Sequence, residues 1–157
     1  MYKRQVLSLA APAGPVAPGA VFAVEIVLRA GDGPDSVDAV VSFDPAWLQV
    51  VDSAGRPAAK IGAGAALPVV LQNSADSRAG QIRFSAGRQP GGATPAGTVV
   101  VATIYFRAAV SRTAVSTPIT FAASGVYGPG VSALAAQQGS VVNVAAGRAF
   151  YLPLIGQ

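Results

Sequence analysis

The chain of 157 residues contains no cysteine and no histidine, and only 11% of its residues are charged. It therefore forms no disulfide, and it lacks the side chains that most often activate nucleophiles and bind transition metals. A chain of this length can bury a hydrophobic core without disulfides or metals. We expect a single domain that spans residues 1–157.

The arrangement of apolar and basic residues disfavours both membrane and nucleic-acid partners. Hydrophobic residues make up 52% of the chain, but 18 glycines and 12 prolines interrupt them. No run approaches the ~20 apolar residues that a spanning helix needs. The net charge is +4, yet the basic residues are spread singly, whereas nucleic-acid sites cluster them and interleave stacking aromatic rings. We predict neither a membrane span nor a nucleic-acid partner.

Short segments with a period of two follow one another along the chain. The N-terminus resembles a signal peptide only faintly because Ser8 and Pro12 interrupt its apolar residues, and an edge strand over residues 6–9 is the better interpretation. The predicted strands, of which 22–29 alternates most regularly, are 6–9, 22–29, 37–43, 48–52, 67–73, 82–86, 98–108, 118–122 and 140–144. Glycine- and proline-rich turns separate them, which is typical of an antiparallel sandwich or jelly roll.

A turn is predicted with particular clarity after residue 43. Pro45 has no N–H to donate to a β-ladder and disfavours helical backbone at Asp44, so the chain must turn between Phe43 and Leu48. The alternation also places five phenylalanines on core-facing positions of their strands. They are Phe22, Phe43, Phe84, Phe106 and Phe121.

The acidic residues do not form a recognisable catalytic or metal-binding pattern. Glu25 is the only glutamate, whereas a glycosidase needs two carboxyl groups roughly 5–10 Å apart across a cleft. Asp32, Asp35 and Asp38 are spaced by three and would suit calcium by chemistry, because calcium binds several oxygen ligands. A solvated turn capped by aspartates is the better interpretation. We predict no enzyme activity, no metal site and no cofactor.

An ordered set of segments resembles a cohesin module, the receptor half of the cohesin–dockerin pair. Its members, in chain order, are Phe22-Ala23-Val24-Glu25-Ile26, Val37 to Phe43, Asp44-Pro45-Ala46-Trp47-Leu48-Gln49-Val50, Gly80 to Gly87, Gly97 to Phe106, Ile119-Thr120-Phe121 and Gly139 to Val144. The resemblance covers residues 6–144 and leaves an apolar tail at 145–157. It implies a nine-stranded antiparallel β-sandwich with jelly-roll topology, and a secreted module at an extracellular or cell-surface location. The implied partner is a protein with a calcium-loaded dockerin, bound through a flat sheet face.

The resemblance also suggests which residues would contact the dockerin. Asp38 matches an acidic position that helps to define the dockerin face, and Ser36 falls where many cohesins carry a polar amide. Strand alternation adds neighbours that point the same way, and the candidate partner-binding residues are Ser36, Asp38, Val40, Ser42, Val70, Gln72, Arg83, Ser85 and Arg88. The loop at 87–92 departs from the family, because Arg88 lies where many cohesins carry an acidic residue. For Asp38, a merely solvated strand position is the alternative.

Two other functions fit the same strand pattern. A carbohydrate-binding module would need exposed aromatic rings; Trp47, after the Asp-Pro turn, is the best candidate, while Tyr105 and Tyr127 are ambiguous. Polysaccharide is therefore a second candidate partner. A structural module of a cell-surface protein would need no binding face at all. The apolar tail is expected to pack as an extra strand, or else to form a junction with a neighbouring domain.

Overall fold

The computed structural model describes residues 5–30, 34–128, 131–132 and 134–147. These residues form twelve strands and no helix, so no helix that could cross a membrane is found among them. The strands are β1 (Gln5–Ala10), β2 (Val21–Ala30), β3 (Ser36–Ser42), β4 (Leu48–Val51), β5 (Gly62–Ala63), β6 (Val69–Asp76), β7 (Gln81–Gly87), β8 (Gly97–Ala108), β9 (Val115–Gly128), β10 (Val131–Ser132), β11 (Leu134–Gln138) and β12 (Ser140–Val144).

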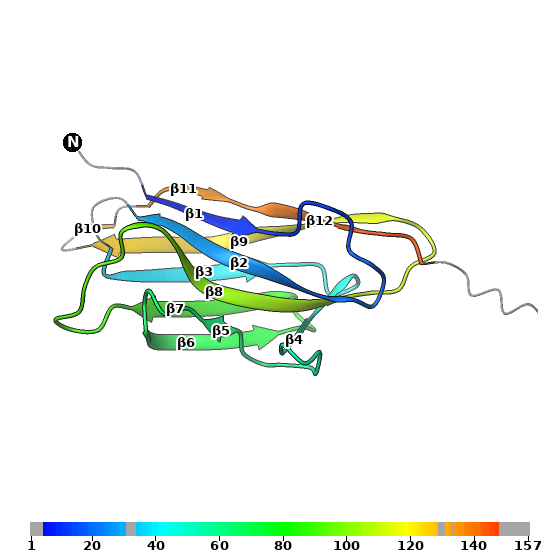
Figure 1. Ribbon diagram of the computed structural model, residues 1–157, viewed down its shortest axis with the longest axis horizontal. Coiled ribbons are helices and arrows are strands. Elements are labelled where there is room, and N and C mark those ends of the chain that lie inside the picture. The colour runs from blue at the N-terminus through cyan, green and yellow to red at the C-terminus, as the bar shows by residue number, and fades with distance from the viewer. Residues whose placement is uncertain (1–4, 31–33, 129–130, 133, 148–157) are drawn as a thin grey trace, which may run out of the picture.

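The strands form a sandwich of two six-stranded sheets whose strands run along the long axis of the molecule (Figure 1). The first, the β2/β8 sheet, has the order β11-β1-β2-β8-β4, with β5 paired to β8. The second, the β3/β7 sheet, has the order β10-β9-β3-β7-β6, with β12 paired to β9. Each sheet buries one face against the other, which confirms the predicted all-β sandwich.

Two details of the predicted topology are wrong. Each of the nine predicted strands overlaps an observed strand, but β5, β10 and β11 bring the count in the described residues to twelve. Strand β1 is not at an edge, because it pairs antiparallel with β2 on one side and parallel with β11 on the other. The sandwich is therefore predominantly, rather than wholly, antiparallel. By pairing with β1, strand β11 satisfies the backbone N–H and C=O groups that β1 would otherwise expose at the edge of the sheet.

The core lies between the two sheets and contains the predicted phenylalanines. Phe43, Phe84, Phe106 and Phe121 are buried, and Phe22 is half-buried. The ring of Phe106 joins the two layers at the core, with the Phe43 ring edge-on at 5.1 Å and the Phe22 ring at 5.9 Å between centroids. Such aromatic pairs add to the stabilisation that burial of apolar area provides.

The predicted turn after β3 is present and is fixed by its own backbone. The carbonyl of Asp44 accepts hydrogen bonds from Trp47 N–H and Leu48 N–H, each at 3.1 Å. Phe43 N–H donates to the carbonyl of Gly80 at 2.9 Å, which holds this turn against the β6–β7 turn. Gly80 has a φ of 68°, and a Cβ there would lie 2.2 Å from the carbonyl oxygen of Phe43. Only glycine fits this contact without strain.

Candidate protein-binding face

The outward side chains of β9, β3, β7 and β6 form one continuous face, which we call the outer face. The register places Asp38 of β3 between Ser85 of β7 and Gly125 of β9. Val40 likewise lies between Arg83 and Ala123. The outward phase of β3 is thus fixed on both sides by antiparallel partners, because residues directly opposite each other share a face of the sheet.

Seven of the nine residues predicted for partner binding lie together on the outer face. Besides Asp38, Val40, Arg83 and Ser85, these are Ser36, Ser42 and Gln72, the last of which lies opposite Ser85. The unbroken alternation of β3 and β7 brings six of these side chains together, and the register of β6 beyond its bulge adds Gln72. Their role in binding remains a prediction.

A shallow hollow of about 280 Å³ lies at the centre of the outer face, and its lining includes Asp38, Val40, Gln72 and Tyr127. Small residues of β9 open this space. Flat sheet faces with one concave centre suit the docking of another folded surface, since a partner side chain can fill the hollow and exclude water.

Tyr127 is the residue of this face that sequence analysis left ambiguous. Its ring lies over Gly125, because a Cβ on Gly125 would come within 2.5 Å of the Tyr127 hydroxyl oxygen and 2.7 Å of Cζ. Gly125 lies directly opposite Asp38, so the phenol ring is placed beside the carboxylate. Tyr127 keeps 40% of its surface exposed. Only the cross-strand register reveals that the Tyr127 ring lies beside Asp38, because nothing in the sequence pairs residue 125 with residue 38.

The charged groups at the centre of the outer face are available to a partner. Among the residues that the structure describes, two ion pairs occur, Asp52–Arg56 and Asp35–Arg88, and neither involves Asp38 or Arg83. Asp38 is exposed, and no described side chain or backbone N–H donates a hydrogen bond to its carboxylate. An exposed carboxylate without an internal donor can accept charge-assisted hydrogen bonds from a partner.

Arg88 holds two loops together at one end of the outer face. Its Nε donates to the Asp35 carboxylate, and its Nη1 donates to the carbonyl of Gly92 at 3.0 Å. Arg88 N–H also donates to the Asp35 carbonyl at 2.8 Å, while Asp35 N–H donates to the Tyr127 carbonyl at 2.7 Å. This network ties the loop after β7 to the start of β3 and to β9. Arg88 therefore supports the face and is less free to meet a partner than the sequence suggested.

The aspartates considered for calcium are not gathered into a site by the described residues. Asp35 is paired with Arg88, and Asp38 points outward from β3. Within the described part of the chain, no three acidic side chains lie close enough together to hold a metal ion. Asp32 lies outside the described residues, as do residues 148–157 of the apolar tail.

Val70 does not share the phase of the outer face, because a β-bulge interrupts β6. Val70 lies opposite Ala86, whereas Gln72 lies opposite Ser85, so Leu71 is the extra residue. Leu71 is 70% exposed and, with the exposed Val69 and Val70, makes an apolar stretch beside the outer face. β6 is the last strand of its sheet, which leaves this stretch at an edge.

No family model matches the chain, and no curated protein matches it. Solved structures do. A type II cohesin domain from the cellulosome of Acetivibrio cellulolyticus aligns with a TM-score of 0.73 and 18% identity, covering 89% of this chain and 95% of that one. A non-cellulosomal cohesin from the archaeon Archaeoglobus fulgidus aligns at 0.69 and 17%, covering 92% and 93%.

A third solved structure, a type I cohesin–dockerin complex from Clostridium thermocellum, matches with a TM-score of 0.73 and 14% identity. The alignment covers 91% of this chain and 94% of the matched one. At such low identities the likeness concerns the backbone arrangement and not individual side chains. The matches extend over nearly the whole sandwich in each case. The chain has the fold of a cohesin module.

Proposed function

We propose that the chain is a non-catalytic, extracellular recognition module of cohesin type, which binds a calcium-loaded dockerin through its outer face. The observation that carries the proposal is the pairing of an exposed carboxylate, Asp38, with the Tyr127 ring that lies over Gly125. This pair occupies the centre of a flat sheet face in a cohesin fold. Three of the similar solved structures are complexes of cohesins with dockerins, which supports the class of partner.

The chemistry of the outer face indicates what the partner must present. An aromatic ring and Val40 at the centre would exclude water, while Gln72 and Arg83 supply polar contacts around them. Asp38 needs donors, such as a hydroxyl or a basic side chain, because an unpaired carboxylate buried in an interface would be costly. A partner with hydroxyl and basic residues flanking a small apolar contact is therefore expected.

Calcium would enter through the partner. The dockerin loops need calcium to fold, whereas no three acidic side chains among the described residues of this chain gather around one point. Secretion belongs to the same proposal, because the resemblance to cohesins implies a secreted module that anchors or assembles other secreted proteins. The chain itself would do no chemistry and would only anchor or assemble such proteins.

Isothermal titration of the chain against dockerins encoded in the same genome tests this proposal. We expect one dockerin to bind in calcium and to lose binding when EDTA is added. Circular dichroism of the isolated chain is the control, and it should show the same β-dominated spectrum with and without EDTA. Loss of the fold in EDTA would assign the metal to this chain, and failure of every dockerin to bind would refute the proposed partner.

A further inference from the structure

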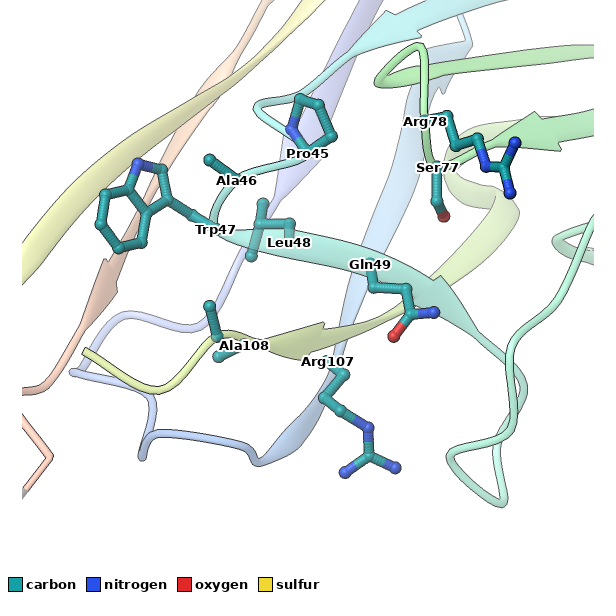
Figure 2. A pocket seen from close by; sticks show the side chains of 10 residues that line it. Pro45, Ala46, Trp47, Leu48, Gln49, Ser77, Arg78, Arg107 and Ala108 are labelled. Carbon is teal, nitrogen blue, oxygen red and sulfur yellow. The ribbon is translucent and has the colours of Figure 1, made fainter.

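A second hollow, of about 390 Å³, lies at one end of the sandwich and away from the outer face. Figure 2 shows Trp47 on one side of it and Arg78 with Ser77 on the other, with Gln49 between them and Arg107 along the lower margin. Its volume falls within the ~300–1,000 Å³ that is typical of pockets for small ligands. None of its lining residues belongs to the outer face.

Hydrogen bonds from distant parts of the chain fix the walls of this hollow. Ser77 Oγ accepts a hydrogen bond from Val50 N–H at 3.0 Å, which attaches the β6–β7 turn to β4. The carbonyl of Trp47 accepts a hydrogen bond from Ala109 N–H at 2.8 Å, which attaches the Asp-Pro turn to the end of β8. The backbone around the hollow is thus fixed before any ligand arrives, which lowers the cost of binding.

Both charged side chains of the hollow are basic. Arg107 is held in place because its Nη1 donates to the Gly19 carbonyl at 2.9 Å and its Nη2 to the Gly55 carbonyl at 2.7 Å. Among the described residues, neither Arg107 nor Arg78 takes part in an ion pair. Two carboxylates lie beside the hollow, and both accept hydrogen bonds from backbone N–H groups: Asp76 from Arg78 and Asp44 from Ala46, each at 2.9 Å. The hollow therefore favours an anion.

The remaining walls favour a saccharide over a peptide. Trp47 is half-buried and presents part of its indole, a surface on which a sugar ring can stack. A peptide in extended form would need free backbone groups on the β4 edge. These are already used, because Val50 N–H donates to Ser77 and the Val50 carbonyl accepts from Ala58 N–H at 3.2 Å. Gln49 and Ser77 instead offer side-chain partners for hydroxyl groups.

We propose that this hollow binds an acidic saccharide, one whose sugar rings carry carboxylate groups. Trp47 would stack on a ring, Arg78 would pair with a carboxylate, and Arg107 would supply fixed positive charge. The inference is independent of the dockerin proposal, because the two sites share no residue and both would be filled at once. A module of this kind would join a partner protein to an acidic polysaccharide.

Isothermal titration of the full chain with trigalacturonate tests this proposal, and cellotriose serves as the neutral counterpart. We expect trigalacturonate to bind about tenfold more tightly than cellotriose, which corresponds to one charge-assisted contact. Arg78→Gln should weaken trigalacturonate binding about tenfold. Arg83→Gln is the matched control: it removes the same charge from the outer face, and it should change the affinity less than about twofold because the charge is distant and screened.

Three results would overturn the proposal: no detectable binding of trigalacturonate, an equal loss with Arg83→Gln, or binding of triglutamate as tight as that of the saccharide. An equal loss with Arg83→Gln would show that the affinity depends only on the net positive charge of the protein. Equally tight binding of triglutamate would show that the hollow does not prefer a sugar. Trp47→Ala should weaken the binding of both saccharides, because both stack on the indole, and should remove the preference for trigalacturonate over triglutamate. Because Trp47 packs against the core, Arg78→Gln carries the test if Trp47→Ala fails to fold. Dockerin binding should be unchanged in Arg78→Gln.

Discussion

The two faces of β3 and its neighbour β7 differ in almost every property, although their residues alternate in sequence. Toward the core, Val37, Ala39 and Val41 are at most 2% exposed. Toward solvent, Asp38 is exposed and Ser85 half-buried, and both line the central hollow of the outer face. Burial of apolar area sets stability. The unpaired polar groups on the solvent side are the ones that the proposed recognition would use. The two properties should therefore respond to different substitutions one residue apart.

The largest difference in stability is expected between substitutions at two adjacent residues of β7. Phe84 is 1% exposed, so Phe84→Ala removes a buried ring and leaves a cavity, which should cost about 3–5 kcal/mol of unfolding free energy. Ser85→Ala is the matched control and should change the stability by less than about 0.5 kcal/mol. Urea denaturation followed by intrinsic fluorescence measures both. Similar losses in the two variants would show that the faces are not separable.

The converse change is expected at Asp38. Asp38→Ala should weaken dockerin binding by roughly 1–3 kcal/mol, because a carboxylate that accepts charge-assisted hydrogen bonds is lost. The melting temperature should stay the same, since an exposed side chain leaves no cavity. Titration of the variant against the dockerin measures the effect. Unchanged affinity would show that the dockerin does not use this carboxylate, and would contradict the outer face as the binding face.

A smaller effect on dockerin binding is expected at Gly125, which shapes the outer face but contributes no polar group to it. Gly125→Ala places a methyl group where the Tyr127 ring lies, so the ring must move. We expect a loss of about 1 kcal/mol in dockerin binding, within the range of single interface substitutions. In a Tyr127→Ala background, Gly125→Ala should have no further effect, and a double-mutant cycle measures this coupling. Additive losses would mean that Gly125 acts through the backbone and not through the ring.

Much of the fold follows from local sequence. The period of two and the glycine and proline turns predict the strands, and the inward phase of Phe84 and Phe121 is confirmed by their burial. By contrast, β11 contains Leu134-Ala135-Ala136-Gln137-Gln138, which shows no alternation, and its parallel partner β1 is far away in the chain. Pairing between distant segments leaves no local signal, so neither the strand nor the enclosed position of β1 was predictable.

The candidate site was predictable to the extent that its strands are regular. Asp38, Arg83 and Ser85 share a face because the alternation of β3 and β7 is unbroken. The bulge at Leu71 shifts the phase of Val70, and a single extra residue of this kind is not visible in an apolar run. The bond between Arg88 and Asp35 joins residues 53 positions apart and depends on how two loops meet. Tertiary contacts of this kind decide which polar residues are free.

The smallest expected effect concerns pH and lies away from both faces. After β4, the N–H of Arg56 donates to the Asp52 carboxylate at 3.0 Å and is the main cause that lowers the pKa of this carboxyl below its ordinary value. Ala54 N–H and the Arg56 guanidinium assist it. Because the pKa is lower in the folded state than in the unfolded one, the stabilisation is present above the unfolded pKa of about 3.9 and is lost as the pH falls below it.

Asp52→Asn should therefore flatten the dependence of stability on pH below about 4, where the native carboxylate would otherwise become protonated. The effect should be slight, because the carboxylate is solvated and its ion pair with Arg56 is exposed. Thermal melting between pH 2 and 7, in the native chain and the variant, provides the measurement, with roughly equal stabilities expected at the acidic end. Dockerin affinity at neutral pH should not change, since Asp52 lies outside the outer face. A loss of dockerin affinity in this variant would show that the loop after β4 influences the outer face. It would contradict the view that binding and stability depend on separate residues.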